Sequence, residues 1–181
     1  MTSQDVNDTA IPCALRDTLR DVIFPAIEGL VRSLRRMADG SSNIVMLART
    51  HGQPATPTRL GKEILVFVER LERELAHAKS ISFIGKFGGA SGNLNAHFAA
   101  YPDVDWLKFC EDFLRDKLSL ECARYTTQIN HHDNLAMVFD NLNRINGILL
   151  DLAQDLWLYI MQDYFRARGK GERGRVVGDA S

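Results

Sequence analysis

The strongest periodicity in this chain lies in residues 135–159, which read LAMVFDNLNRINGILLDLAQDLWLY. Apolar residues recur there at alternating steps of three and four, the spacing that lines up side chains along one side of an α-helix. A stripe this long and broad needs more than one neighbouring helix to cover it. We therefore predict an all-α protein, a bundle of long helices with this helix inside the bundle or between subunits. The stripe contains Leu135, Val138, Leu142, Ile145, Leu149, Leu152, Leu156 and Tyr159.

Three further segments have a helical period. Residues 11–37 repeat apolar side chains at helical steps, residues 58–82 do so beside a charged face, and residues 104–118 form a shorter amphipathic segment. Residues 2–5, Thr-Ser-Gln-Asp, are candidate N-caps ahead of the first of these segments, so a helix start is predicted there. Two prolines fall in that segment. We expect Pro12 in the first turn of its helix, and we expect Pro25 to kink it, because proline lacks a donor and clashes with the preceding turn.

The composition is that of an ordinary soluble globular protein. The chain has 181 residues, 45% of them hydrophobic and 25% charged, which suffices for one domain with a substantial core. A formal net charge of −1 gives no electrostatic case for binding nucleic acid or an anionic membrane.

No apolar run approaches the roughly 20 residues of a membrane span, and the polar N-terminus is unlike a signal peptide, so we expect a cytoplasmic protein. Cys13, Cys110 and Cys122 lack metal or redox spacing and are expected to be reduced packing residues.

Chemistry is expected in residues 49–63, which read RTHGQPATPTRLGKE. His51 lies there in a tight Gly/Pro segment, which we predict to be a loop between the apolar run 44–48 and a long amphipathic helix. A loop held between rigid elements can aim its side chains, and imidazole suits proton transfer near neutral pH. Most such loop histidines are structural or solvated, so position alone leaves both interpretations open.

Four segments of the chain, taken in order, resemble motifs of one family. They are TSQDVN at 2–7, THGQPATP at 50–57 followed by LGKE at 60–63, KFGGASGNLNAH at 86–97, and YTTQI at 125–129 followed by His132-Asp133. Together they resemble the adenylosuccinate lyases of the fumarase/aspartase superfamily. The resemblance covers residues 2 to about 165, which corresponds to less than half of a family member.

The resemblance implies a chemistry and a set of site residues. The family eliminates fumarate from adenylosuccinate, and from a succinylated imidazole-carboxamide ribotide, in purine biosynthesis. Such a β-elimination needs a base, donors that stabilise a carbanionic intermediate, and an acid for the leaving nitrogen. By resemblance His51 is the proton donor, while Thr2, Ser3, Thr50 and Gln128 bind substrate. No metal or organic cofactor is implied. Family members are homotetramers with active sites shared between subunits, so a homo-oligomer is expected.

The resemblance also predicts missing parts. The family's general base is a serine in a flexible Ser-Ser-x-Met-Pro-x-Lys-x-Asn loop after the long helix, whereas residues 166–181 here are Gly/Arg-rich without apolar periodicity. Residues 176–181 can be encoded so that a one-base shift reads Ser-Ser-Ala-Met-Pro-His, so we predict a tail translated out of frame. A genuine disordered basic tail is the alternative. We expect residues 1–165 to be a partial central helical-bundle domain, without the family's N-terminal domain and inactive alone.

Other interpretations remain open. The glycine-rich residues 85–92 could be mistaken for a phosphate loop, but the strand–helix unit of a dinucleotide fingerprint is not predicted around them. The run His131, His132, Asp133 could be taken for metal ligands, but adjacent residues at a helix start point in different directions, which favours capping. For the whole chain, the alternatives are a non-catalytic helical fragment that self-associates, and argininosuccinate lyase or fumarase.

Overall fold

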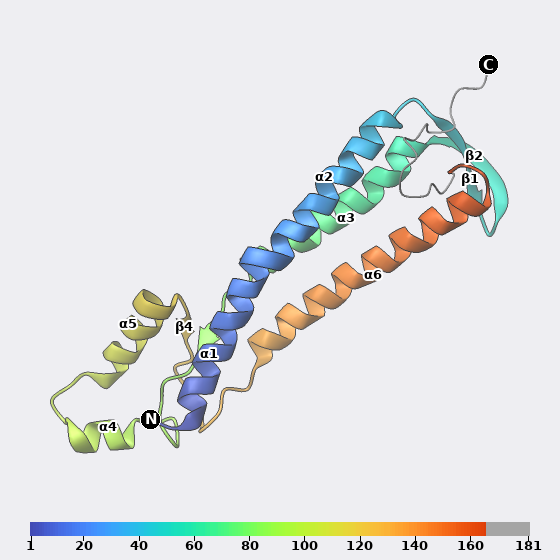
Figure 1. The fold of residues 1–181 in the computed structure, drawn as a ribbon. Helices are drawn as coiled ribbons and strands as arrows, with labels where there is room; N and C mark the ends of the chain where they lie inside the picture. The colour runs from blue at the N-terminus through green and yellow to red at the C-terminus, as the bar shows by residue number, and fades with distance from the viewer. Residues whose placement is uncertain (166–181) are drawn as a thin grey trace. The chain divides into compact units, whose positions relative to one another are not determined.

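The computed structural model describes residues 1–165, and these are mostly helical (Figure 1). The chain divides into two compact units. Unit 1 contains Met1–Ala26 and Ala76–Asn141, and unit 2 contains Ile27–Leu75 and Leu142–Ser181. The sequence prediction of an out-of-frame or disordered tail at 166–181 lies outside the described residues.

The first helical segment runs without a break from residue 3 to residue 40, as α1 (Ser3–Thr18), a π-helical turn η1 (Leu19–Ile23) and α2 (Phe24–Gly40). Helix α1 begins at Ser3, ahead of the apolar segment 11–37. It begins there because the Asp5 carboxylate accepts the free N–H of Thr2 at 2.8 Å, which caps the first turn. Pro12 therefore lies buried in the middle of α1 and not in a first turn, so that prediction is wrong.

The helix accommodates Pro25 through the π turn that precedes it. The Phe24 N–H donates to the carbonyl of Leu19, five residues back, which widens the turn just before the proline. A widened turn relieves the clash between a proline ring and the carbonyls of the preceding turn. The position of η1 is thus explained by Pro25.

The segment around His51 is a β-hairpin, where the sequence predicted a loop. Strands β1 (Val45–Thr50) and β2 (Gln53–Arg59) pair antiparallel and are joined by His51 and Gly52. A second, two-residue parallel pairing joins β3 (Ile84–Gly85) to β4 (Glu121–Cys122). The prediction of an all-α protein therefore needs correction, because a mostly helical fold also carries two small sheets.

Unit 2 is built from most of α2, the hairpin, most of α3 (Leu60–Ser80) and the C-terminal part of α6 (Asp133–Met161). Helices α2 and α3 lie side by side (Figure 1), joined by an Arg35–Glu72 ion pair at 2.7 Å. Close approach at their connection requires Gly61, where a Cβ would lie 2.4 Å from the Ala38 carbonyl oxygen. The core of this unit contains Ile27, Val31, Leu34, Ala38, Met46, Leu60, Ile64, Phe67, Val68, Leu71, Leu75, Ile145, Ile148 and Leu152.

Helix α6 confirms the predicted long helix but buries a slightly different line of residues. Val138, Ile145 and Leu152 are buried as the stripe predicts. Between them the buried positions are Asn141 and Ile148, whereas the neighbouring Leu142 and Leu149 are only partly buried. The buried line follows steps of three and four from Val138, and the rest of the broad stripe is left partly or fully exposed.

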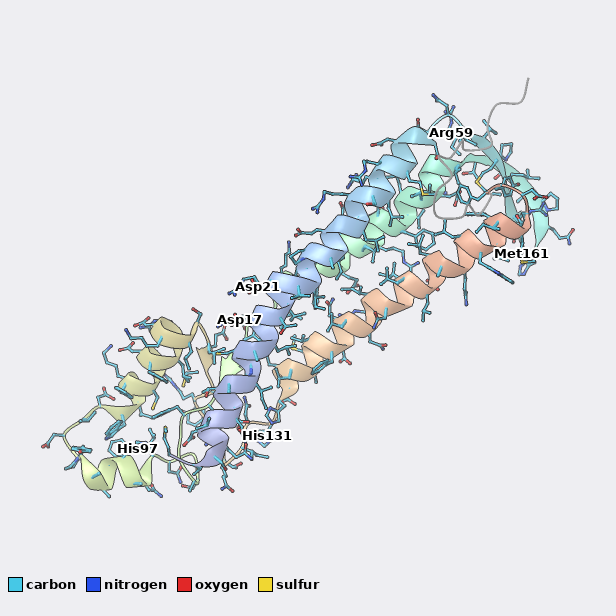
Figure 2. All side chains as sticks on the ribbon, viewed as in Figure 1. Asp17, Asp21, Arg59, His97, His131 and Met161 are labelled. Atoms are coloured by element: carbon cyan, nitrogen blue, oxygen red, sulfur yellow. The ribbon has the colours of Figure 1, made fainter. Side chains whose placement is uncertain are left out.

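Unit 1 combines α1, η1 and the short helices α4 (Asn95–Ala100) and α5 (Trp106–Leu118) with the β3–β4 pair. Figure 2 labels His97 on α4 and His131 in the segment leading into α6. The His97 ring packs 5.0 Å from Trp106 and 5.5 Å from Phe87, centroid to centroid, which makes it a member of an aromatic cluster. Cys110 is buried on α5, as expected of a packing residue.

No helix within residues 1–165 is both long enough and apolar enough to span a lipid bilayer.

Candidate functional site

A buried carboxylate organises the start of α1. Asp5 Oδ1 accepts the Lys86 ammonium at 2.7 Å and the backbone N–H groups of Gly88 and Gly89, each at 3.1 Å. Asp5 Oδ2 accepts the N–H of Thr2. Lys86 also donates to the Gly89 carbonyl at 2.9 Å, and both charged side chains are almost completely buried. A buried ion pair is stable only with such additional hydrogen bonds, and here they are present.

The contacts of Asp5 change its acidity. Burial by itself raises the pKa of Asp5, but the hydrogen bonds from Lys86, Thr2, Gly88 and Gly89 stabilise the carboxylate more strongly and lower its pKa to about 2. Asp5 is therefore ionised throughout the physiological range. It does not act as a proton donor at neutral pH.

A second buried carboxylate lies three residues further along α1. Asp8 Oδ2 accepts the backbone N–H of Asn130 at 2.9 Å, and Asp8 Oδ1 lies 3.7 Å from His132 Nε2. Residues three apart on a helix share a face, so Asp5 and Asp8 leave α1 on the same side. They nevertheless bind different segments, Asp5 at residues 86–89 and Asp8 at Asn130. The same short length of α1 thus contacts the glycine-rich segment and the segment that carries Gln128.

The glycine-rich segment also contacts the backbone that precedes Gln128. A Cβ on Gly92 would lie 2.0 Å from the carbonyl oxygen of Thr126, and a Cβ on Gly88 would lie 2.9 Å from Gly92 Cα. Gly92 has a φ of +79°, which favours glycine on conformational grounds as well. Three of the four segments quoted for the family resemblance therefore meet in unit 1, with glycine needed where the backbones touch.

The predicted substrate-binding residues of unit 1 lie on this framework. Thr2 caps α1, and its Oγ1 is buried and has no hydrogen-bond partner among residues 1–165. Ser3 and Gln128 are exposed, Ser3 in the first turn of α1 and Gln128 two residues before the Asn130 amide that Asp8 binds. An exposed helix start presents free N–H groups and a partial positive charge, which suits a carboxylate ligand.

The predicted proton donor lies in unit 2, at the tip of the hairpin. His51 and Gly52 have φ values of +49° and +73°, and Thr50 pairs with Gln53 across the turn. Two central residues with positive φ define a type I′ turn, whose twist matches the paired strands. Thr50 and His51 are both exposed, and Arg49 Nη1 donates to the Gly52 carbonyl at 3.0 Å. The turn presents the imidazole to solvent from a rigid support.

A cleft of about 530 Å³ lies beside the hairpin within unit 2, between β1 and the end of α6. Burial, then the charges of Asp151 and Glu63, raise the pKa of Asp155 in this cleft. Burial, then the charges of Asp155 and Glu63, raise the pKa of Tyr159 to about 12. Tyr159 thus keeps its hydroxyl proton at neutral pH, and both apolar and polar side chains line the cleft. It is lined by Met46, Leu47, Ala48, Arg49, Gly52, Thr58, Glu63, Asp155, Leu158, Tyr159 and Gln162.

The structure also bears on the phosphate-loop and metal interpretations. The N–H groups of Gly88 and Gly89 point to Asp5, so these two amides are not free to bind a phosphate. Within residues 1–165, no three His, Cys, Asp or Glu side chains converge as metal ligands. His132 instead lies near Asp8, and His131 is exposed.

Sequence reasoning missed the two buried carboxylates and their partners. Asp5 and Lys86 both stand inside quoted motifs, but they are 81 residues apart, and no local pattern links them. The available signal was compositional: a lysine directly before a glycine-rich run, and two acidic residues three apart at a predicted helix start. These positions suggest burial only once the segments are known to be in contact.

The chain is similar to a known class of enzyme, the lyases. Residues 1–168 match the family described as Lyase, and the chain belongs to that family. Over this span it is similar to curated adenylosuccinate lyases: 48% identical to that of Dictyostelium discoideum over 96% of this chain, and 44% and 40% identical to those of Legionella pneumophila and Escherichia coli over 92%. The predicted resemblance to adenylosuccinate lyases within the fumarase/aspartase superfamily is confirmed.

The solved structures agree with the family. A fumarate lyase from Mesorhizobium sp. BNC1 superposes with a TM-score of 0.72 and 26% identity, over 90% of this chain and 37% of that one. The chain spans 38% of the Dictyostelium relative and 36% of the Legionella and Escherichia coli relatives. The matched part is therefore less than half of each of these proteins.

Proposed function

We propose that this chain carries the central helical part of an adenylosuccinate lyase, the enzyme that eliminates fumarate from adenylosuccinate and from the related imidazole-carboxamide ribotide. The observation that carries this proposal is sequence identity of 40–48% to curated adenylosuccinate lyases over nearly the whole chain. Residues 1–165 then correspond to the central domain of the enzyme. A cytoplasmic location is part of the same proposal.

The proposed roles follow the chemistry of elimination. His51 protonates the leaving nitrogen, a role supported by its exposure at the tip of a rigid hairpin. Thr2 and Ser3 bind a substrate carboxylate, a role supported by their place at the start of α1. Thr50 and Gln128 contribute further substrate contacts. The fixed N–H and hydroxyl donors of such a site stabilise the negative charge that develops on the substrate.

The proposed enzyme is a homo-oligomer, a tetramer as in the family. The observation that supports association is the outer face of α6, where large apolar side chains are exposed. Leu150, Trp157 and Met161 are each at least 60% exposed and follow one another at steps of seven and four residues. A face of this kind is typical of a helix that packs against another chain.

A chimera tests the proposed function, because the chain spans only part of its relatives. Residues 1–165 replace the matching segment of the Escherichia coli adenylosuccinate lyase, and fumarate release from adenylosuccinate is followed by absorbance. We expect turnover from the chimera and loss of turnover by at least about a hundredfold in its His51→Asn variant. The same assay on the unmodified chain tests the expectation that it is inactive alone.

Asparagine is the matched replacement for His51, because it tolerates a positive φ and keeps the hairpin turn. A chimera that folds and assembles but does not release fumarate would contradict the proposed function. Full activity of the His51→Asn chimera would contradict the role of His51 alone. Turnover of argininosuccinate or malate in place of adenylosuccinate would favour the other lyases of the superfamily.

A further inference from the structure

Two carboxylates on α1 are buried without taking part in the proposed proton transfers. Asp5 and Asp8 are each 2% exposed, although aspartate is seldom buried unless its charge has partners. They share one face of the helix and bind different segments of unit 1. Their hydrogen-bond donors are main-chain N–H groups and one lysine, and His132 Nε2 lies 3.7 Å from Asp8 Oδ1. Each carboxylate therefore fixes the position of a backbone segment.

The Asp5 contact fixes the glycine-rich segment against α1. The three donors to Oδ1 come from residues 86–89, and the donor to Oδ2 is the Thr2 amide at the helix start. Both oxygens are therefore occupied, and a shift of either segment would break several hydrogen bonds at once. Since Lys86 is buried with Asp5, its charge is also left without a partner by such a shift.

The Asp8 contact fixes the segment that carries Gln128. A hydrogen bond of 2.9 Å holds the amide of Asn130, and two residues span at most about 7 Å of chain. Gln128 is therefore tethered close to the point where Asp8 leaves α1. The close approach of Gly92 to the Thr126 carbonyl also restricts the position of the same segment.

We infer that Asp5 and Asp8 are positioning residues, which together hold Thr2, Ser3 and Gln128 in the one arrangement that binds the carboxylates of the substrate. Neither aspartate touches the substrate in this scheme. Helix α1 acts as the rigid support, and its two carboxylates set the places of the two segments beside it. The inference rests on the proposed function, which gives those three residues their substrate role.

Hydrogen exchange of single backbone amides in the full chain separates positioning from general stabilisation. In Asp8→Ala, the amide of Asn130 loses its acceptor, and we expect it to exchange about tenfold faster while Gly88 and Gly89 keep their rates. In Asp8→Asn, the remaining side-chain oxygen still accepts, so most of the protection should return. Asp17→Ala, at a partly exposed position on α1, is the matched control and should change none of these amides.

The Asp5 contact is tested with a variant that avoids an unpaired buried lysine. The double change Asp5→Asn with Lys86→Met removes both charges, and we expect faster exchange at Gly88 and Gly89 with an unchanged rate at Asn130. If the double variant does not fold, the Asp8 variants still decide the inference. An equal acceleration of all three amides by Asp8→Ala, or no change at Asn130, would overturn it.

Fumarate binding links positioning to the site. Titrating the ¹⁵N-labelled full chain with fumarate should shift the amide signals of Thr2, Ser3 and Gln128. We expect Asp8→Ala to weaken fumarate binding about tenfold and Asp8→Asn to restore it to within about twofold. No binding by the unmodified chain would count against the proposed substrate site, while the exchange rates would still decide whether the carboxylates position their segments.

Discussion

Asp5 should make the stability of unit 1 depend on acid pH. Its pKa of about 2 in the folded protein lies below the ordinary value of 3.8, so the stabilisation is fully present above about pH 4 and is lost as pH falls toward 2. The difference in pKa corresponds to about 2 kcal/mol of unfolding free energy. Urea unfolding at pH 5 and at pH 2.5 measures it. Asp5→Asn should remove this part of the pH dependence, and an unchanged pH profile in that variant would contradict the assignment.

Substitution of Lys86 should be among the single changes that lower the free energy of unfolding most. Lys86→Met leaves the Asp5 carboxylate buried without its counter-charge, and breaking a buried pair from one side costs about 3–5 kcal/mol of unfolding free energy. Adding Asp5→Asn removes the stranded charge, so the double variant should be more stable than Lys86→Met alone. Chemical denaturation of the two variants is the measurement. A double variant less stable than either single change would show that hydrogen bonding, and not charge, dominates this contact.

Two substitutions of His51 should separate the effect of the backbone conformation of the turn from the effect of the imidazole on stability. His51→Ala forces a residue without a polar side chain into a positive φ and should destabilise the turn by about 1 kcal/mol, whereas His51→Asn should leave stability within about 0.5 kcal/mol of the unmodified protein. Thermal unfolding of both variants gives the comparison. Equal destabilisation by both changes would mean that the imidazole itself stabilises the hairpin.

The line of residues that α6 buries differs from the line that the sequence pattern predicts, because packing neighbours set the rotation of the helix. A stripe this broad fits several rotations of the helix, and packing within each unit selects the line that contains Asn141 and Ile148. The alternation of three and four steps is kept, because it is a property of the helix. Which of the adjacent apolar residues is buried depends on the packing partners of the helix, and these cannot be inferred from its apolar period.

The exposed apolar face of α6 should drive self-association of the chain. Trp157→Gln together with Leu150→Gln removes much of its apolar area, so we expect the double variant to sediment as a smaller species than the unmodified chain at micromolar concentration. Gln154→Ala, an exposed polar position on the same helix, is the control and should leave the sedimentation unchanged. A monomeric unmodified chain would contradict the proposed oligomer.

The sequence by itself determined the helices and the family. Helical period depends on neighbours three and four residues away, so the segments near 11–37, 58–82, 104–118 and 135–159 were predictable. The family followed from the four motifs, and the roles of His51, Thr2, Ser3, Thr50 and Gln128 remain predictions drawn from them. The hairpin was missed because Pro54 and Pro57 argue against a strand. In β2 both prolines are exposed, and they lie opposite Arg49 and Leu47 with an irregular register between the two pairs.

Only the tertiary structure decided how the motifs are held together. Asp5 and Lys86 are 81 residues apart, and Asp8 and Asn130 are 122 apart, so no local period connects either pair. The pairs form because burying a carboxylate requires donors, and those donors come from whichever segments the fold brings to α1. Sequence patterns report on neighbours along the chain, whereas the site depends on neighbours in space.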